Sequence, residues 1–299
     1  MVLPFHTRCR PGAGPGTLLL VAAVLAATGP LSAAEPGPGI PGDDAALMER
    51  ERHDPGEHLR FIEGLLERRF HDMAEEELRA FLDRHPDHEL APKAMFRLIE
   101  CLREQDKTRE TVAAINRFQA RWPKHELSPK LYLLKGELLL RMDQVTQAKA
   151  CFKRLTLTAD TVTREAALYF LAQCYAREGD MQQALETYAK ISDKPFDTKH
   201  LYRPYALFAI ASARFHRGQI QEAAQDFQRL TREENVPPGI REEALYRLGE
   251  THFLREDYRE AIEVYELLLV EFPDGYFARE AGKRRAWAYF ALEDYRKAL

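Results

Sequence analysis

Five residues with metal-binding side chains fall in two short, nearly identical stretches of the sequence. His85, His88 and Glu89 occupy the first stretch, and His125 and Glu126 occupy the second. Imidazole nitrogens and carboxylate oxygens ligate zinc at about 2 Å. In the helical repeats predicted below, equivalent residues of neighbouring repeats lie about 10 Å apart, too far for shared ligation. We therefore interpret the five residues as parts of solvated turns. The alternative is a metal bound within a single turn, but one turn offers too few ligands. Neither a metal nor a cofactor is predicted.

Three cysteines follow residue 34, namely Cys101, Cys151 and Cys174. Cys101 and Cys174 share one repeat position that other repeats fill with glycine or alanine, so both are interpreted as small buried residues. Their separation by two repeats puts them beyond the reach of a disulfide. Cys151 and Cys174 are predicted on adjacent helices, and whether they pair is left open.

Sequence patterns of common catalytic sites are absent from the chain. It has no nucleophile elbow, no HExxH and no phosphate-binding glycine loop. The acidic runs Glu75–Glu77 and Glu242–Glu243 are predicted to be solvated helix faces. No catalytic residue is predicted, and the sequence favours a non-enzymatic protein.

A small residue recurs along the chain in steps of 37, 37, 36, 39, 38 and 37 residues. The recurring residues are Ala74, Thr111, Ala148, Ala184, Ala223, Ala261 and Ala298. Twelve positions before each recurring residue lies another residue, which is glycine or alanine in five of the seven repeats. Four positions after the recurring residue, in the first six repeats, lies a large apolar residue. This pattern predicts pairs of antiparallel helices in close contact, with the large side chain filling the groove between them.

One phrase within this array is duplicated. Pro86–Lys93 returns as Pro123–Lys130, shifted by 37 residues, with six of eight positions identical. A period between 20 and 50 residues indicates stacked supersecondary units. The prolines Pro86, Pro123 and Pro273 each lie twelve residues after a recurring small residue and are predicted to end the second helix of their repeat.

The segment Leu245–Gly249, then Asp257–Ala261, Tyr265 and Pro273, resembles the tetratricopeptide repeat. The resemblance covers residues 57–299 and implies an all-α, right-handed α-solenoid of about seven helix-turn-helix units, the last truncated. It also implies a protein or peptide partner. The usual period is about 34 residues. Since the twelve-residue spacing inside each repeat is kept, the extra residues are predicted to lie between repeats, where the duplicated phrase stands.

The linkers Arg84–Pro86, Arg121–Pro123 and Glu271–Gly275 resemble those of bacterial envelope proteins of this family. These relatives are the outer-membrane assembly lipoprotein of the barrel-insertion machinery (BamD-like) and the periplasmic coordinator associated with the Tol–Pal system. The lipoprotein carries a cysteine just after its apolar segment, whereas Cys9 of this chain precedes the apolar segment of this chain. This difference argues against identity with the lipoprotein.

In this family the first helix of each repeat lines a concave groove, and the resemblance assigns two groove positions per helix. These positions are Phe96, Leu133, Tyr169, Phe208 and Tyr246, and one turn later Glu100, Glu137, Gln173, Ser212 and Glu250. Rings beside carboxylates suit an extended or helical peptide. The alternative, that the rings pack against one another and the acids are solvated, stays open. Glutamate replaces the asparagine of the family's carboxylate clamp at three positions, which disfavours a free acidic C-terminus as ligand.

The first residues predict export. Residues 1–16 carry two arginines and no acid, residues 17–27 are apolar, and Ser32, Ala33 and Ala34 follow. This layout is typical of a secretory signal peptide cleaved after Ala34. Residues 35–56 are predicted to form a proline- and glycine-rich linker. The mature net charge would be −6, because residues 1–34 contain two of the 43 basic residues and none of the 47 acidic ones. This acidic balance disfavours nucleic acid as partner, and no transmembrane span is predicted in the mature chain.

These features favour an exported, non-enzymatic scaffold in the bacterial periplasm or cell envelope. It would bind a peptide or protein, envelope-assembly components among them, in the concave groove. The chain stops one residue after Ala298, partway into a predicted helix. The alternative is therefore the repeat arm of a larger exported enzyme whose catalytic domain lies beyond Leu299. A third hypothesis is a solenoid that assembles with itself.

Overall fold

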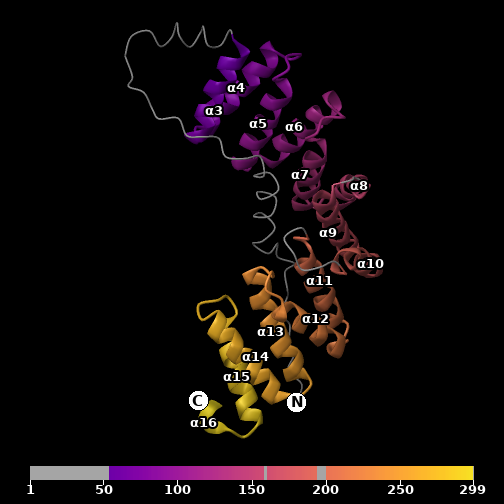
Figure 1. Cartoon of the computed structure of the whole chain (residues 1–299), viewed down its shortest axis with the longest axis vertical. Helices are drawn as coiled ribbons and strands as arrows, with labels where there is room; N and C mark the ends of the chain where they lie inside the picture. The colour runs from indigo at the N-terminus through magenta and orange to yellow at the C-terminus, as the bar shows by residue number, and fades with distance from the viewer. Residues whose placement is uncertain (1–53, 158–159, 194–199, 299) are drawn as a thin grey trace. The chain divides into compact units, whose positions relative to one another are not determined.

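The computed structural model describes residues 54–157, 160–193 and 200–298, whose regular secondary structure is entirely helical (Figure 1). This confirms the predicted all-α fold. The predicted signal peptide, residues 1–34, lies outside the described residues, as does the predicted linker apart from residues 54–56. The described helices α3–α16 belong to two compact units, which divide between Met142 and Asp143.

The first unit contains two complete helix pairs and the first helix of a third. Its helices are α3 (Pro55–Glu67), α4 (His71–Arg84), α5 (Ala91–Glu104), α6 (Thr108–Arg121) and α7 (Ser128–Arg141). Each helix packs against the next one in the chain.

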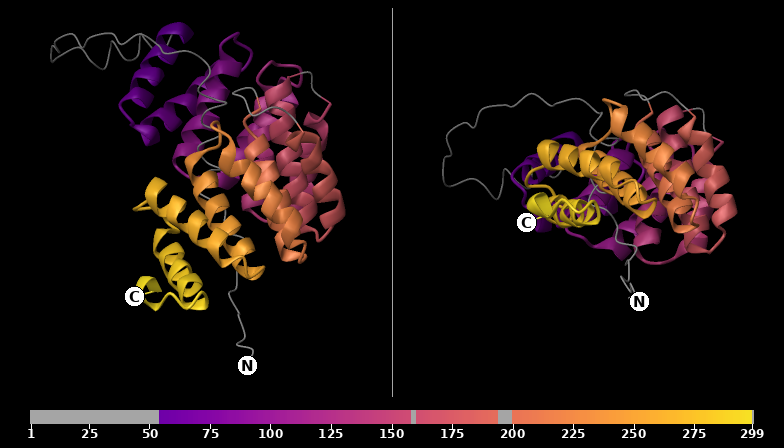
Figure 2. Two further views of the ribbon diagram at one scale, coloured as in Figure 1. Left: turned by 60° about the horizontal axis from the view of Figure 1, so that its bottom comes forward. Right: turned by 90° about the horizontal axis from the view of Figure 1, so that it is seen from below.

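The second unit begins with the second helix of the third pair. Its helices are α8 (Val145–Leu155), α9 (Thr161–Arg177), α10 (Met181–Ser192), α11 (Arg203–His216), α12 (Ile220–Arg232), α13 (Pro238–Leu254), α14 (Tyr258–Glu271), α15 (Ala278–Ala291) and α16 (Tyr295–Ala298). Successive helices again pack side by side, as α13, α14 and α15 show in Figure 2.

Helix α3 begins two residues earlier than the sequence indicated, inside the predicted linker. The side chain of Asp54 accepts a hydrogen bond from the backbone N–H of Gly56, and Pro55 occupies the first helical position. Proline is favoured there because its missing N–H is not needed and its φ suits a helix. The Asp-Pro-Gly sequence at the end of the predicted linker is therefore a helix start.

The two helices of each repeat are joined by three residues in every case, so the spacing inside the repeat is constant. The middle residue of each turn has a positive φ. These residues are Arg69, Asp106, Asp143, Gly179, Gly218, Glu256 and Glu293. In six of the turns the next N–H bonds the carbonyl five residues earlier, as in Phe70 N to Leu65 O at 2.9 Å. This is the Schellman motif, which normally favours glycine.

The recurring small and large residues form the core that the sequence predicted. Ala74, Ala184 and Ala261 have no exposed surface, and the ring of Tyr265, four residues after Ala261, is also fully buried. Gly249 faces that ring so closely that a Cβ on it would lie 2.4 Å from Cε1 of Tyr265. The small residues therefore do set the approach of the paired helices.

The variable spacing lies between repeats, as predicted, in linkers of five to ten residues. In the duplicated phrase, Nδ1 of His88 accepts a hydrogen bond from the N–H of Leu90 at 3.1 Å, and Nδ1 of His125 accepts one from Leu127 at 3.2 Å. Leu90 and Leu127 pack against the core of the first unit. The two histidines thus fix the turn that leads into the next helix.

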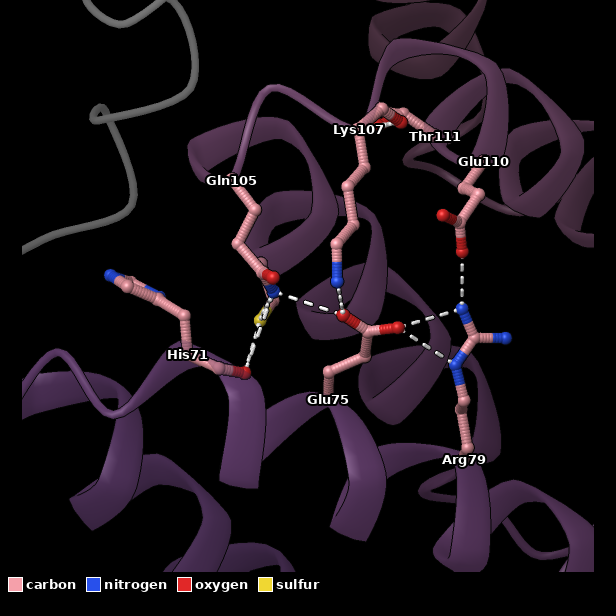
Figure 3. Close-up of polar contacts among 8 residues, drawn as sticks. His71, Glu75, Arg79, Gln105, Lys107, Glu110 and Thr111 are labelled. Carbon is pink, nitrogen blue, oxygen red and sulfur yellow. Dashed lines mark hydrogen bonds and ion pairs between the residues drawn. The ribbon is translucent and has the colours of Figure 1, made fainter.

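Glu75, predicted to be solvated, is instead the centre of a polar network between α4 and the turn before α6 (Figure 3). It accepts hydrogen bonds from Lys107 at 2.7 Å, Arg79 at 2.8 Å and Gln105 at 3.0 Å. Burial raises the pKa of Glu75, but the hydrogen bonds from Lys107, Arg79 and Gln105 outweigh it and hold the pKa below its usual value. Within the acidic run, only Glu76 is exposed.

Glu242 is a second correction to the predicted solvated acids. Its side chain is buried, and Oε1 accepts a hydrogen bond at 2.7 Å from the backbone N–H of Phe277, the residue that precedes α15. The carboxylate therefore ties the linker after α14 to α13. The sequence signal is weak because the two groups are 35 residues apart.

Candidate protein-binding surface

All ten predicted groove residues lie on first helices of repeats, two per helix and one turn apart. Four of them belong to the first unit, on α5 and α7, and six belong to the second unit, on α9, α11 and α13. The structure therefore places them in equivalent positions within each unit. Their surroundings decide which of them a partner could reach.

The five predicted apolar groove positions, four of them aromatic, serve mainly in packing. Leu133 is 1% exposed and Tyr246 is 6% exposed, with the Tyr246 ring stacked on that of Phe277 at a centroid distance of 4.8 Å. Phe96 is half-buried against the core of the first unit. Phe208 is half-buried and contacts the ring of Phe227 at 5.7 Å.

Tyr169 lies in a cluster of aromatic side chains in the second unit. Its ring centroid is 5.7 Å from that of Tyr188, 5.5 Å from Tyr202 and 6.0 Å from Tyr205. Burial raises the pKa of Tyr169 to about 12, although a hydrogen bond with Gln173 opposes the shift. Tyr202 and Tyr205, from the start of the next repeat, were not identified from the sequence. The cluster joins α9 to α11, so the half-buried ring of Tyr169 serves mainly in packing.

Two of the three carboxylates are paired within their own helix. Glu100 accepts a hydrogen bond from Arg97 at 2.9 Å, and Glu250 accepts one from Arg247 at 2.8 Å. Arg284 of the following repeat approaches Glu250 to 3.7 Å. Both pairs have the arginine three residues before the glutamate, a spacing that brings side chains together on a helix. The predicted acidic ladder is therefore neutralised at these two positions.

Glu137 differs because leucine, Leu134, stands three residues before it. Burial raises its pKa well above the usual value, and the charges of Arg103 and Arg141 only partly oppose this. Its Oε1 is buried and has no hydrogen-bond partner among the described residues. Glu137 therefore tends toward the neutral carboxylic acid, unlike the paired Glu100 and Glu250.

Gln173 and Ser212 are half-buried, uncharged and polar. With Phe208, they are predicted positions of the second unit that are partly accessible and carry no charge and no ion pair. The basic side chains beside the lining positions were missed from the sequence, although the repeated Arg-x-x-Glu spacing at Arg97 and Arg247 could have revealed them. Lys93 likewise pairs with Glu63 at 2.9 Å.

Cys101 and Cys174 are buried, as predicted. The thiol of Cys101 donates to the carbonyl of His71 at 3.2 Å, and burial raises the pKa of Cys174 to about 12. Neither is suited to nucleophilic chemistry, which needs the thiolate. Within the described ranges, no group of three or more His, Cys, Asp or Glu side chains could hold a metal ion.

Family profiles described as tetratricopeptide repeat match residues 93–125, 133–197 and 208–276, together more than half of the chain. No curated protein sequence matches it. Among the helices of the described residues, none is long and apolar enough to cross a membrane.

Solved structures share the fold at low sequence identity. A tetratricopeptide repeat protein from Parabacteroides merdae is 17% identical with a TM-score of 0.57, over 82% of this chain and 89% of that chain. The C-terminal part of a repeat protein from Cytophaga hutchinsonii is 17% identical with a TM-score of 0.61, over 80% and 90%. PilW, described as a widely conserved type IV pilus biogenesis factor, is 14% identical with a TM-score of 0.55, over 76% and 97%.

Proposed function

Because this chain belongs to the tetratricopeptide repeat family, we propose that it is a non-enzymatic scaffold that binds a protein or peptide segment on the first helices of its repeats. The observation that carries the proposal is the surface of the second unit around Gln173, Phe208 and Ser212. These side chains come from adjacent repeats, are partly accessible and are uncharged.

A partner segment on this surface would find aromatic area from Phe208 and hydrogen-bonding groups from Gln173 and Ser212. Such mixed contacts suit an extended or helical segment, whose backbone supplies the matching donors and acceptors. Packed rings such as Tyr169 in its aromatic cluster and the buried Tyr246 hold the helices in register. The binding surface is therefore smaller than the ten positions taken from the family pattern.

Site-specific photocrosslinking tests the proposal in the living cell. A photoreactive amino acid replaces Gln173 or Ser212 in one set of proteins, and the exposed Gln147 of α8 or Gln221 of α12 in the control set. The control positions lie on second helices of the same unit, outside the proposed surface, so they report crosslinking that does not depend on that surface. We expect a discrete adduct with a partner protein at the first two positions alone.

Equal adducts in the two sets, or adducts at the control positions only, would contradict the proposal.

A second pair of proteins strengthens the test. Gln173→Arg with Ser212→Arg places two long cationic side chains on the proposed surface, whereas Gln147→Arg with Gln221→Arg makes the same charge change elsewhere. The former should abolish the adduct formed by a photoreactive residue at 208, and the latter should keep it. Unchanged circular dichroism spectra exclude misfolding.

We further propose that the protein works in the bacterial periplasm or cell envelope, with envelope-assembly components as the class of partner. The support is the signal-like order of basic, apolar and small residues in positions 1–34. The pilus-factor description of PilW is compatible with an envelope role, although that similarity concerns the fold alone. A fusion of residues 1–60 to alkaline phosphatase should be active, and the mature chain should begin at Glu35. An inactive fusion with an uncleaved N-terminus contradicts this placement.

A further inference from the structure

A glutamate occupies the second groove position of the first helix in four repeats. These glutamates are Glu63, Glu100, Glu137 and Glu250. Among the described residues, Glu137 of α7 is the one of the four that forms no ion pair. Because the four positions are equivalent within their repeats, the three paired glutamates indicate which group Glu137 lacks.

Each of the paired glutamates contacts basic side chains of the chain itself. Glu63 pairs with Lys93 at 2.9 Å and with Arg97 at 3.7 Å. Glu100 pairs with Arg97 at 2.9 Å. Glu250 pairs with two arginines, at 2.8 Å and 3.7 Å. An arginine is therefore present at every paired member, and a second cation is present at two of them.

The positions that supply these arginines are apolar around Glu137. Leu134 stands three residues earlier on α7, where Arg97 and Arg247 stand before their own glutamates. The same position of the following repeat is Phe170. Oε1 of Glu137 is enclosed and has no hydrogen-bond partner among the described residues, whereas Oε2 is not enclosed. A ligand can therefore reach the carboxyl through Oε2.

Two arginines of the first unit act on this carboxyl from a distance. The charges of Arg103 on α5 and Arg141 on α7 favour the carboxylate, but burial outweighs them and raises the pKa of Glu137. Arg141 is already paired with Asp106 at 2.9 Å. A buried carboxyl that lacks a partner costs stability. Folding alone therefore does not account for a glutamate at this position.

We propose that Glu137 binds a basic side chain, arginine or lysine, of a partner segment that lies on α5 and α7. The inference rests on the proposed function, since it takes the ligand to be a protein segment, but it concerns a different surface. The partner's cation would fill the place that an arginine of the chain fills in the other repeats. Since Glu63 and Glu250 each accept two cations, the nearby charge of Arg103 is compatible with this pairing.

Binding of the cation is coupled to loss of a proton. Burial favours the carboxylic acid form of Glu137 in the free protein, and a guanidinium or ammonium group beside it stabilises the carboxylate. The proton passes to the solvent, and the bound pair carries one charge of each sign. Arg103 and Arg141 stay charged throughout, and α6, which also packs against α7, contributes no charge to the shift. The affinity therefore falls about tenfold for each pH unit below the raised pKa of Glu137.

Selection from a library of random peptides displayed on phage tests the proposal without a known partner. The purified wild-type protein and the Glu137→Gln variant are used in parallel. The wild type should enrich peptides with arginine or lysine at one position, and Glu137→Gln should not. Glu100→Gln is the matched control, because Glu100 is already paired with Arg97, and it should keep the enrichment. Unchanged circular dichroism spectra exclude misfolding.

A peptide selected by the wild type then measures the pairing directly. Its arginine is replaced by citrulline, or its lysine by acetyllysine, which removes the charge and keeps most of the shape. The replacement should weaken binding to the wild type about tenfold or more, as couplings between close charge pairs do. It should weaken binding to Glu137→Gln less than about twofold. The affinity of the unmodified peptide should fall toward low pH for the wild type and stay constant for Glu137→Gln.

Enrichment of acidic peptides would assign this surface to the charge of Arg103 and would overturn the proposal. So would a selection without basic residues, an equal effect of the neutral replacement on both proteins, or an affinity that rises as the pH falls. Crosslinks at Gln173 and Ser212 arise on the second unit and do not require Glu137. Either proposal can therefore fail while the other stands.

Discussion

Replacing Gly249 by alanine tests whether the close approach of α13 and α14 sets the packing of the second unit. The new Cβ would lie 2.4 Å from Cε1 and 2.7 Å from Cζ of Tyr265. The ring is fully buried and therefore cannot swing into solvent. Overpacking costs about 1–3 kcal/mol, and contact with an enclosed ring places this site near the upper end. Alanine gains about 1 kcal/mol in helix propensity, so the net loss is about 2 kcal/mol.

Urea unfolding followed by circular dichroism measures this loss. With a slope of about 2 kcal/mol per M, the midpoint should fall by about 1 M. Gly64→Ala and Gly282→Ala are matched controls, because both glycines lie inside helices and a Cβ would have no non-local heavy atom within 4 Å. These two variants should gain up to about 1 kcal/mol. The comparison isolates the collision from the propensity change.

A second substitution identifies Tyr265 as the cause. In a Tyr265→Leu background the ring is gone, and Gly249→Ala should then cost at least about 1 kcal/mol less than in the wild type. The reasoning is refuted if Gly249→Ala stabilises the protein as Gly282→Ala does. It is also refuted if the cost is the same in both backgrounds.

Four further substitutions test the turns and the polar contacts. Glu256 has a φ of 64°, which is costly for a residue with a Cβ, so Glu256→Gly should raise stability by about 0.5–1 kcal/mol in the same urea assay. Gly179→Ala places a Cβ at a φ of 84° and should lower stability by about 1 kcal/mol. Equal effects of the two substitutions would contradict this reasoning. The pKa of Glu75 is below its usual value because hydrogen bonds from its neighbours outweigh burial, so its stabilisation is present at neutral pH and is lost as the pH falls. The stability difference between wild type and Glu75→Gln should therefore shrink from about pH 6 to about pH 3, and a constant difference would exclude the linkage. Glu242→Ala removes the acceptor of the Phe277 N–H and should cost about 1–2 kcal/mol, with faster hydrogen exchange at the Phe277 amide; unchanged protection would show that the contact is dispensable.

Local regularities made the core predictable. The spacing of Ala74, Ala184 and Ala261 repeats because each must face its partner helix at the same height, and the structure buries all three completely. The constant three-residue turns follow from the same spacing. The left-handed conformation was not predicted at positions such as Arg69 and Glu256, because glycine, the usual signal for this conformation, is absent there.

The sequence by itself determined the helical repeat, its period and the residues that fill the space between paired helices, since these depend on contacts repeated at fixed separations. Only the tertiary structure decided which groove positions are accessible. Tyr246 is stacked beneath Phe277, Glu250 is neutralised by Arg247, and Gln173 remains approachable. These differences depend on neighbours from other repeats and on the directions of side chains. A pattern that treats all repeats as equivalent cannot distinguish them.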